Sequence, residues 1–215
     1  MTLPALILQS TYGKLAWGIV IATLLVSVIS ASRQLSARAI LQLLGISIIA
    51  ALLPDRFSPA YWIALAFQWP SGMLAGLCLL HLVRQSHPAS AGSTLPVPLA
   101  GAIAALGAVL YLDALGLASS GLYFWGFGPR GAPVFALAAM ALCAAGIVQG
   151  YARPQMFAAL GAITLFTMLR LPTGNLWDAL LDPMLWIWAV VSLGLRAWRK
   201  TASNNINQGV VSGNS

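Results

Sequence analysis

Long apolar runs, separated by short polar segments, organise this chain. The runs are continuous and rich in Leu, Ala and Ile, whereas a transmembrane β-barrel would show short segments of alternating polarity. A bilayer crossing needs about 20 apolar residues in a helix. The pattern predicts an all-α, polytopic transmembrane helical bundle with about seven spans, at residues 14–30, 39–53, 61–83, 97–117, 134–151, 155–169 and 184–195.

Composition supports the same class of protein. The chain has 215 residues, of which 60% are hydrophobic and only 7% charged, far below the share of about a quarter in soluble domains. The net charge is +7, but the basic residues lie mostly singly at the ends of spans, so nucleic-acid binding is not expected. Cys78 and Cys143 both fall inside apolar runs, where we expect them to be buried packing residues rather than a disulfide or a metal site.

The basic residues also predict the orientation, because cytoplasmic loops are enriched in Lys and Arg. If the N-terminus lies outside, seven of the eleven basic residues fall on the inner side, namely Arg33, Arg38, Arg84, Arg153, Arg196, Arg199 and Lys200. We therefore expect the N-terminus outside and the C-terminus in the cytoplasm, in a bacterial inner membrane. In an alternative interpretation, residues 1–32 are a signal peptide, whose removal would leave Arg33 and Arg38 outside, against this bias.

Residues 1–200 are expected to form a single transmembrane helical domain. Small residues recur at helical spacing in the later spans, Ala158 and Ala162 among them, and such pairs let helices approach closely. The segment 201–215 is rich in Asn, Ser and Gly, so we expect it to be a disordered cytoplasmic tail.

The third span contains a polar interruption at residues 68–72. Pro70 lacks an N–H and disturbs the preceding turn, which frees a backbone carbonyl near the middle of the membrane. Gln68 and Ser71 add polar side chains at the same depth, and Trp69 lies beside them, far from the span ends where most of the tryptophans lie. Broken helices near the midplane form the binding sites of many transporters. The alternative is a simple proline kink whose freed carbonyl is bound by a neighbouring helix.

The predicted outer surface holds most of the other candidate site residues. They combine charged and aromatic side chains, and one hypothesis is that they converge: Asp55, Arg56, Asp113, Tyr111, Tyr123, Trp125, Arg130, Arg170, Asp178 and Asp182. Such a mixture suits a sugar, a glycolipid head group or a partner domain. The alternative is a set of solvated loop ends and structural ion pairs.

Residues 170–183 also contain signals of local structure. Asn175 is placed to cap a short helix, with Asp178 in its first turn. Asp182 followed by Pro183 is typical of the cap and first position of the last span. Both acids therefore have a structural interpretation beside the functional one.

Motifs of known chemistry do not occur in the sequence. His81 and Arg84 lie three apart, but a histidine without a second metal-binding side chain nearby is a poor metal site, so lipid phosphate is the favoured contact. There is no Gly-x-Ser-x-Gly, no His-Glu-x-x-His and no phosphate-binding glycine loop. We predict neither a metal nor a cofactor, and an enzymatic role is not favoured.

The sequence thus leads to three functional hypotheses. The first is an accessory or scaffold subunit of a bacterial envelope or surface-polysaccharide system. The second is a small-molecule carrier with a mid-membrane site at the broken third helix. The third is a membrane-embedded transferase or hydrolase that uses an outer Asp. The expected partners are the lipid bilayer and either another membrane protein or a glycolipid.

Overall fold

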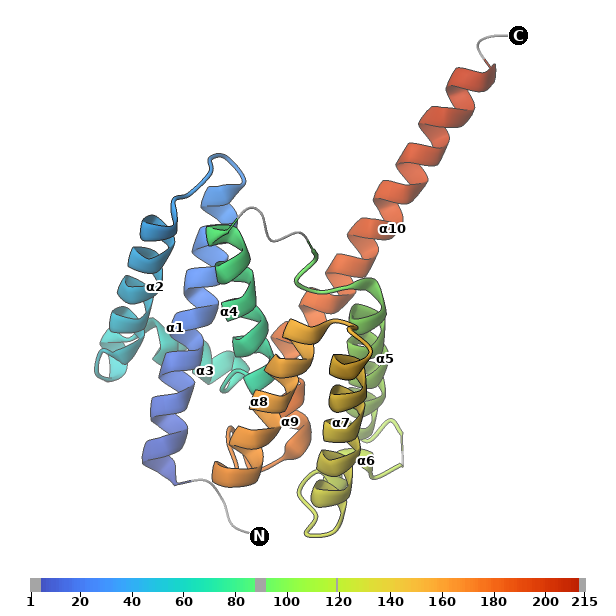
Figure 1. Ribbon diagram of the computed structural model, residues 1–215. Coiled ribbons are helices and arrows are strands. Elements are labelled where there is room, and N and C mark those ends of the chain that lie inside the picture. Colours follow the sequence, from blue (N-terminus) through green and yellow to red (C-terminus); the bar gives the residue numbers. More distant parts are fainter. Residues whose placement is uncertain (1–4, 88–91, 119, 213–215) are drawn as a thin grey trace.

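The computed structural model describes residues 5–87, 92–118 and 120–212, and these residues contain helices but no strand. This confirms the all-α prediction for the described ranges. In chain order the helices are α1 (Leu6–Ser30), α2 (Ala37–Leu52), the short 3₁₀ helix η1 (Asp55–Phe57), α3 (Pro59–Phe67), α4 (Gly72–Ser86), α5 (Val97–Ala114), α6 (Leu122–Trp125), α7 (Gly131–Val148), α8 (Arg153–Leu169), α9 (Leu176–Leu180) and α10 (Pro183–Ser212) (Figure 1).

Three helices of the described ranges, α1, α5 and α7, are long and apolar enough to cross a membrane. They overlap the first, fourth and fifth predicted spans, although α1 begins earlier than predicted, at Leu6. Helix α2 is also apolar but shorter. The helices are thus compatible with a membrane protein, while seven spans and the orientation stay predictions.

Two other predicted elements differ in the structure. The third span is divided, because α3 ends at Phe67 and α4 begins only at Gly72, on the far side of Pro70. Helix α10 continues through Ser212, so it covers most of the segment that we expected to be disordered. Extending an existing helix adds one hydrogen bond for each residue fixed, which is more favourable than nucleating a new helix.

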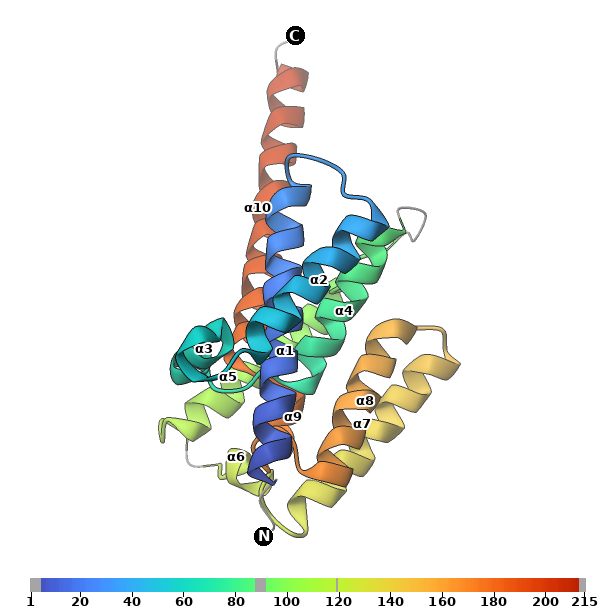
Figure 2. The ribbon, with the colours of Figure 1, turned by 90° about the vertical axis from the view of Figure 1, so that its left-hand side faces the viewer.

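The helices pack as neighbouring pairs. Helix α1 lies along α2 and α4, α4 contacts α8, α7 contacts α8, and α5 contacts α10 (Figures 1 and 2). The start of α1 and the end of α10 lie at opposite ends of the molecule, and α10 projects beyond the other helices. The short helices α6 and α9 lie toward the end where α1 begins.

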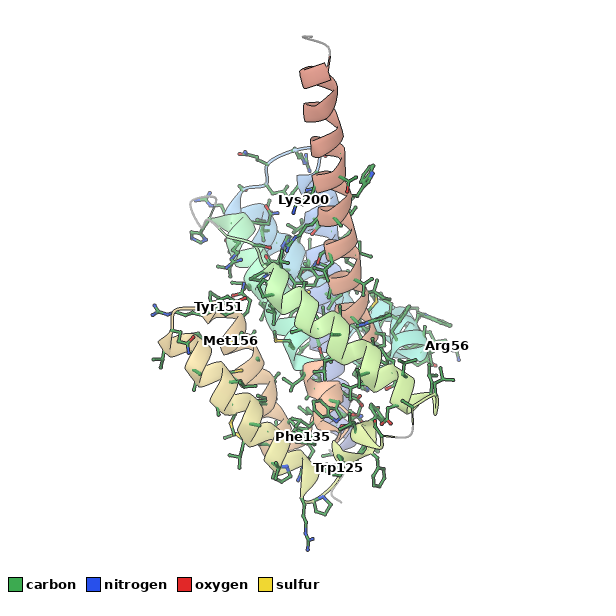
Figure 3. The ribbon with its side chains drawn as sticks, turned by 90° about the vertical axis from the view of Figure 1, so that its right-hand side faces the viewer. Arg56, Trp125, Phe135, Tyr151, Met156 and Lys200 are labelled. Atoms are coloured by element: carbon green, nitrogen blue, oxygen red, sulfur yellow. The ribbon has the colours of Figure 1, made fainter. Side chains whose placement is uncertain are left out.

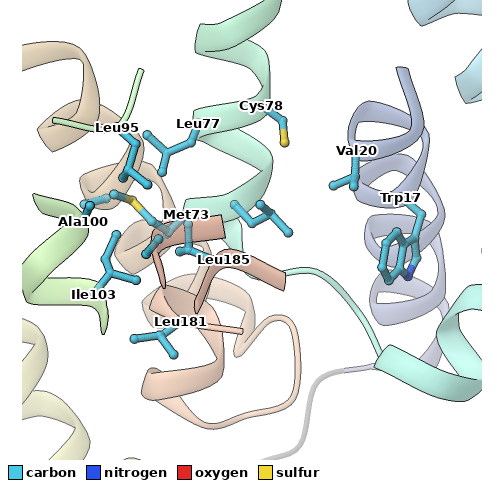
Figure 4. Close-up of a cluster of buried hydrophobic side chains, with 14 of the residues drawn as sticks. Trp17, Val20, Met73, Leu77, Cys78, Leu95, Ala100, Ile103, Leu181 and Leu185 are labelled. Atoms are coloured by element: carbon cyan, nitrogen blue, oxygen red, sulfur yellow. The ribbon is translucent and has the colours of Figure 1, made fainter. Parts of the chain in front are cut away.

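The main hydrophobic core joins these helices around Trp17, Leu77 and Leu185, which are buried (Figure 4). Large apolar side chains also cover much of the outside, and exposed examples occur on α1, α2, α7 and α8: Val28, Ile49, Leu142 and Met168. Soluble monomers rarely expose extensive apolar surface, whereas lipid solvates it. The exposed apolar side chains are therefore as expected for a protein in a bilayer.

The contact between α4 and α8 is built from small residues. A Cβ added at Gly72 would lie 2.8 Å from the Cβ of Ala162, and one added at Gly76 would lie 2.7 Å from the Cβ of Ala158. These distances leave no room for a larger side chain. The Ala158–Ala162 pair seen in the sequence is therefore the contact surface that α8 presents to α4.

Candidate functional site

The break between α3 and α4 is the first component of the site. Gln68 adopts a positive φ of 58°, which is uncommon for a residue other than glycine, and the hydroxyl of Ser71 accepts the N–H of Leu74 at 3.0 Å as the cap of α4. Side chains of α1 bind the freed carbonyls. The hydroxyl of Tyr12 donates to the carbonyl of Pro70 at 2.9 Å, and the indole of Trp17 donates to that of Gln68 at 2.9 Å. The helix break is thus anchored on α1.

Asp182 provides the second component. Its Oδ1 accepts the N–H of Leu185 at 2.8 Å and caps α10, as its position before Pro183 predicted. Its Oδ2 accepts the N–H of Ser71 at 2.6 Å. Only 6% of the residue is exposed. One buried carboxylate therefore joins the starts of α4 and α10.

Helix α9 holds the short helix α6 in place. The side chain of Asn175 caps α9 by accepting the N–H of Trp177 at 3.0 Å, as predicted, and its amide donates to the carbonyl of Tyr123 at 3.3 Å. The indole of Trp177 donates to the carbonyl of Leu122 at 2.8 Å. A Cβ at Gly126 would meet the Oδ1 of Asn175 at 1.8 Å, so only glycine fits there. These contacts fix the position of the Tyr123 side chain.

Asp178 is the second carboxylate of the site. It accepts a hydrogen bond from the hydroxyl of Thr173 at 2.5 Å. The hydroxyl of Tyr123 donates to the same carboxylate, at 3.0 Å to Oδ1 and 3.3 Å to Oδ2. Asp178 therefore connects α9 to α6 through neutral donors.

These components surround a cavity of about 190 Å³. Gln68 and Trp69 line it from the helix break, and Thr173 and both carboxylates line it from the α8–α10 segment. Tyr111 of α5 and Tyr123 of α6 contribute aromatic rings. The hydroxyl of Tyr111 is buried and has no hydrogen-bond partner in the described parts of the chain. The cavity thus combines aromatic surface with hydrogen-bond acceptors.

Burial controls the ionisation of this site. Burial raises the pKa of Asp178, the bonds from Thr173 and Tyr123 oppose the shift, and the charge of Asp182 adds to it. Burial also raises the pKa of Asp182, against the hydrogen bonds donated to it. The pKa of Tyr123 rises to about 12, first through burial and then through the charge of Asp178. Both carboxyl groups therefore hold a proton more readily than an exposed Asp.

Six of the predicted site residues do not line this cavity: Pro70, Ser71, Asp113, Trp125, Arg130 and Arg170. Asp113 accepts the N–H groups of Ser120, Gly121 and Tyr123 at 2.8–2.9 Å and the hydroxyl of Ser120 at 2.7 Å, so it shapes the loop that leads to α6. The guanidinium of Arg170 lies 5.0 Å from the centre of the Phe166 ring.

Trp125 and Arg130 line a separate, more open cavity of about 420 Å³ with Phe135 (Figure 3). Its polar lining is sparse, and Phe124 and Trp125 beside it are 67% and 55% exposed. The predicted outer charged and aromatic residues thus do not all converge: some line the first cavity, Trp125 and Arg130 line the second, and Asp113 and Arg170 line neither. Gln68, Tyr123, Asp178 and Asp182 line the first cavity, and Pro70 and Ser71 lie in the helix break beside it.

His81 belongs to a third region, among α1, α4 and α10. Its ring nitrogens lie 3.2 Å from the hydroxyl of Ser27 and 3.4 Å from that of Thr94, within hydrogen-bonding distance. It lines a largely apolar cavity of about 360 Å³. The favoured contact with lipid phosphate stays a prediction.

Sequence reasoning missed several residues of the first cavity and its supports. Thr173 carried no signal beyond its place in the segment 170–183. Tyr12 and Trp17 lie on α1, more than 50 positions from the carbonyls they bind. Trp69 stood out in the sequence only because it lies far from the ends of its predicted span. Contacts over such sequence separations cannot be read from local patterns.

Comparison with models of protein families, with curated proteins and with solved structures finds no match for this chain.

Proposed function

We propose that this protein is a carrier for a small polar solute, with its binding site in the cavity between the α3–α4 break and the α9–α10 turn. The observation that carries the proposal is the meeting of a broken helix with two carboxylates at one cavity, of which Asp182 is buried and Asp178 half-buried. Irregular backbone inside a membrane protein is tolerated where it is buried in protein or lines a cavity, and carriers place substrates at such breaks.

The size of the cavity supports a small solute. Its volume is about 190 Å³. Pockets for drug-sized ligands measure about 300–1,000 Å³. The volume therefore suits a small solute better than a glycolipid head group.

The proposal includes the membrane arrangement expected from the sequence. About seven spans cross a bacterial inner membrane, with the N-terminus outside and the C-terminus in the cytoplasm. Helices α6 and α9 lie toward the end of the molecule where α1 begins, which this orientation places at the outer surface. The cavity then receives its solute from the outside.

Uptake by proteoliposomes tests the proposal. The purified protein alone should take up at least one member of a panel of labelled small polar solutes. Ala114→Phe, which places a bulky ring at the cavity wall, should abolish that uptake. Gly161→Ala is the matched control, because an added Cβ there meets nothing within 4 Å. The proposal fails if no solute enters, or if Ala114→Phe leaves uptake unchanged.

An accessory subunit of an envelope or surface-polysaccharide system is the second candidate. The observation in its favour is the exposed apolar surface formed by Phe124, Trp125 and Val134 beside Arg130. Exposed aromatic and Arg side chains are typical of binding surfaces. Co-purification with a synthase or transferase that Trp125→Ala removes, together with an absence of uptake, would favour this role.

A further inference from the structure

The two carboxylates of the proposed carrier site have no basic partner among the described groups. Every described donor to Asp178 and Asp182 is a hydroxyl or a backbone N–H. The other titratable groups that interact with them come from four surrounding helices and are likewise not basic: Tyr12 of α1, Cys78 of α4, Tyr111 of α5 and Tyr123 of α6.

A buried carboxylate without a positive partner is costly in its charged form. Two routes remove the cost, since the group either takes up a proton or receives a cation from solution. Asp178 and Asp182 line the same cavity, so one bound cation can lie near both. The hydrogen bonds from the protein leave further lone pairs on each carboxylate, which has about four acceptor positions.

The rest of the lining also suits a cation. Trp69, Tyr111 and Tyr123 border the cavity, and aromatic rings attract ammonium groups through their negative faces. The Trp69 ring is packed so closely on Gly13 that a Cβ there would lie 2.0 Å from it. The hydroxyl of Tyr111 is buried beside the cavity and has no hydrogen-bond partner among the described residues.

From this geometry we infer that the solute is a small organic ammonium ion, and that its binding displaces a proton from the Asp178–Asp182 pair. The inference rests on the proposed carrier function. The charge balances: the ammonium ion enters with its positive charge, a carboxylic O–H releases its proton to external water, and the resulting carboxylate pairs with the ammonium. A neutral polyol leaves this pair unsatisfied, and an anion is repelled by it.

Ethanolammonium and ethylene glycol form a matched pair of probes, because they have the same number of non-hydrogen atoms and differ in charge. Calorimetric titration of the full-length protein in detergent, in two buffers of different ionisation enthalpy, counts the protons released on binding. We expect ethanolammonium to bind with release of up to one proton, and ethylene glycol not to bind. In the pH range where the Asp178–Asp182 pair holds the proton, the affinity for ethanolammonium should increase up to about tenfold for each unit that the pH rises.

Variants locate the effect. Asp178→Asn should lower affinity for ethanolammonium at least tenfold and remove the proton release. Gly161→Ala should bind as the unaltered protein does. Unfolding curves identify any variant that fails to fold, and Thr173→Val, which removes one donor to Asp178 at nearly constant volume, then serves as the second test and should change the pH at which the proton leaves.

The outcomes separate this inference from the carrier function. Equal binding of both probes, or binding of ethanolammonium without proton release, overturns the inference and leaves the carrier standing. The same holds if proteoliposomes take up a solute from the panel but neither cation binding nor proton release occurs. If the protein takes up nothing and binds nothing, the carrier function itself is wrong.

Discussion

The backbone N–H of Ser71 donates a hydrogen bond of 2.6 Å to the Oδ2 of Asp182, 111 positions later in the chain. The other oxygen of the same carboxylate accepts the N–H of Leu185 at 2.8 Å. Asp182 therefore lies at the N-terminal ends of α4 and α10, where unpaired N–H groups and the helix dipoles favour negative charge. These interactions partly offset the cost of burying the carboxylate, and they hold the helix break at a fixed distance from the α9–α10 turn.

Asp182→Ala should destabilise the protein by about 2–4 kcal/mol, because it removes a helix cap and leaves the buried N–H of Ser71 without a partner. Asp182→Asn should cost about half as much, since the amide oxygen still accepts one of the two bonds. Unfolding by denaturant in detergent measures both variants. Equal losses for Ala and Asn would show that the hydrogen bonds are not what stabilises this junction.

Stability should decrease as the pH rises above the ordinary Asp value of 3.8, because the folded-state pKa values of Asp178 and Asp182 are raised. In that window the folded protein binds more protons than the unfolded chain, so the contribution is fully present below 3.8 and is lost as the pH rises through the raised values. Melting temperatures across this range, compared with those of Asp178→Asn, measure the effect. The variant should show a flatter profile, and an identical profile would contradict the assignment to Asp178.

Gly76→Ala should destabilise the contact between α4 and α8 by about 1–3 kcal/mol, because the new Cβ would lie 2.7 Å from that of Ala158. Gly161→Ala on α8 is the control, since nothing lies within 4 Å of the added atom. The control should be neutral or gain up to about 1 kcal/mol from the higher helix propensity of Ala. If both variants lose the same stability, the close approach of the two helices is not the cause.

Local signals in the sequence predicted the parts of this site that depend on neighbouring residues. Asn175 and Asp182 cap the helices that directly follow them, and Pro70 marks a break within its own span. The cavity instead depends on contacts such as that between Tyr123 and Asp178, which are 55 positions apart. Packing geometry rather than local preference decides such contacts.

Asp113 is the opposite case, because the sequence marked it as a site residue although its contacts are structural. It accepts four hydrogen bonds from the segment that follows α5. The donors are Ser120, Gly121 and Tyr123, which lie 7 to 10 positions later in the chain. A carboxylate near the end of an apolar run gives the same sequence pattern whether it binds a ligand or orders the next loop. Only the conformation of that loop distinguishes the two roles.

Tyr123→Phe should raise the pKa of Asp178, because the hydroxyl of Tyr123 donates to the charged carboxylate and so opposes the upward shift caused by burial. The ring itself stays, and the hydrogen bonds from Asn175 and Trp177 to the backbone of α6 should keep that helix in place. The expected loss of stability is therefore only about 1 kcal/mol, the usual net contribution of one hydrogen bond.

Infrared titration of the protonated carboxyl band measures this shift directly, with Asp178→Asn to assign the band. In Tyr123→Phe the band should persist to higher pH than in the unaltered protein. Thr173→Val provides an independent comparison, because the hydroxyl of Thr173 donates to the same carboxylate from the other side and its loss should move the band in the same direction. An unchanged titration in both variants would mean that neither hydroxyl stabilises the charged form, and the neutral donors would then not control when this carboxylate releases its proton.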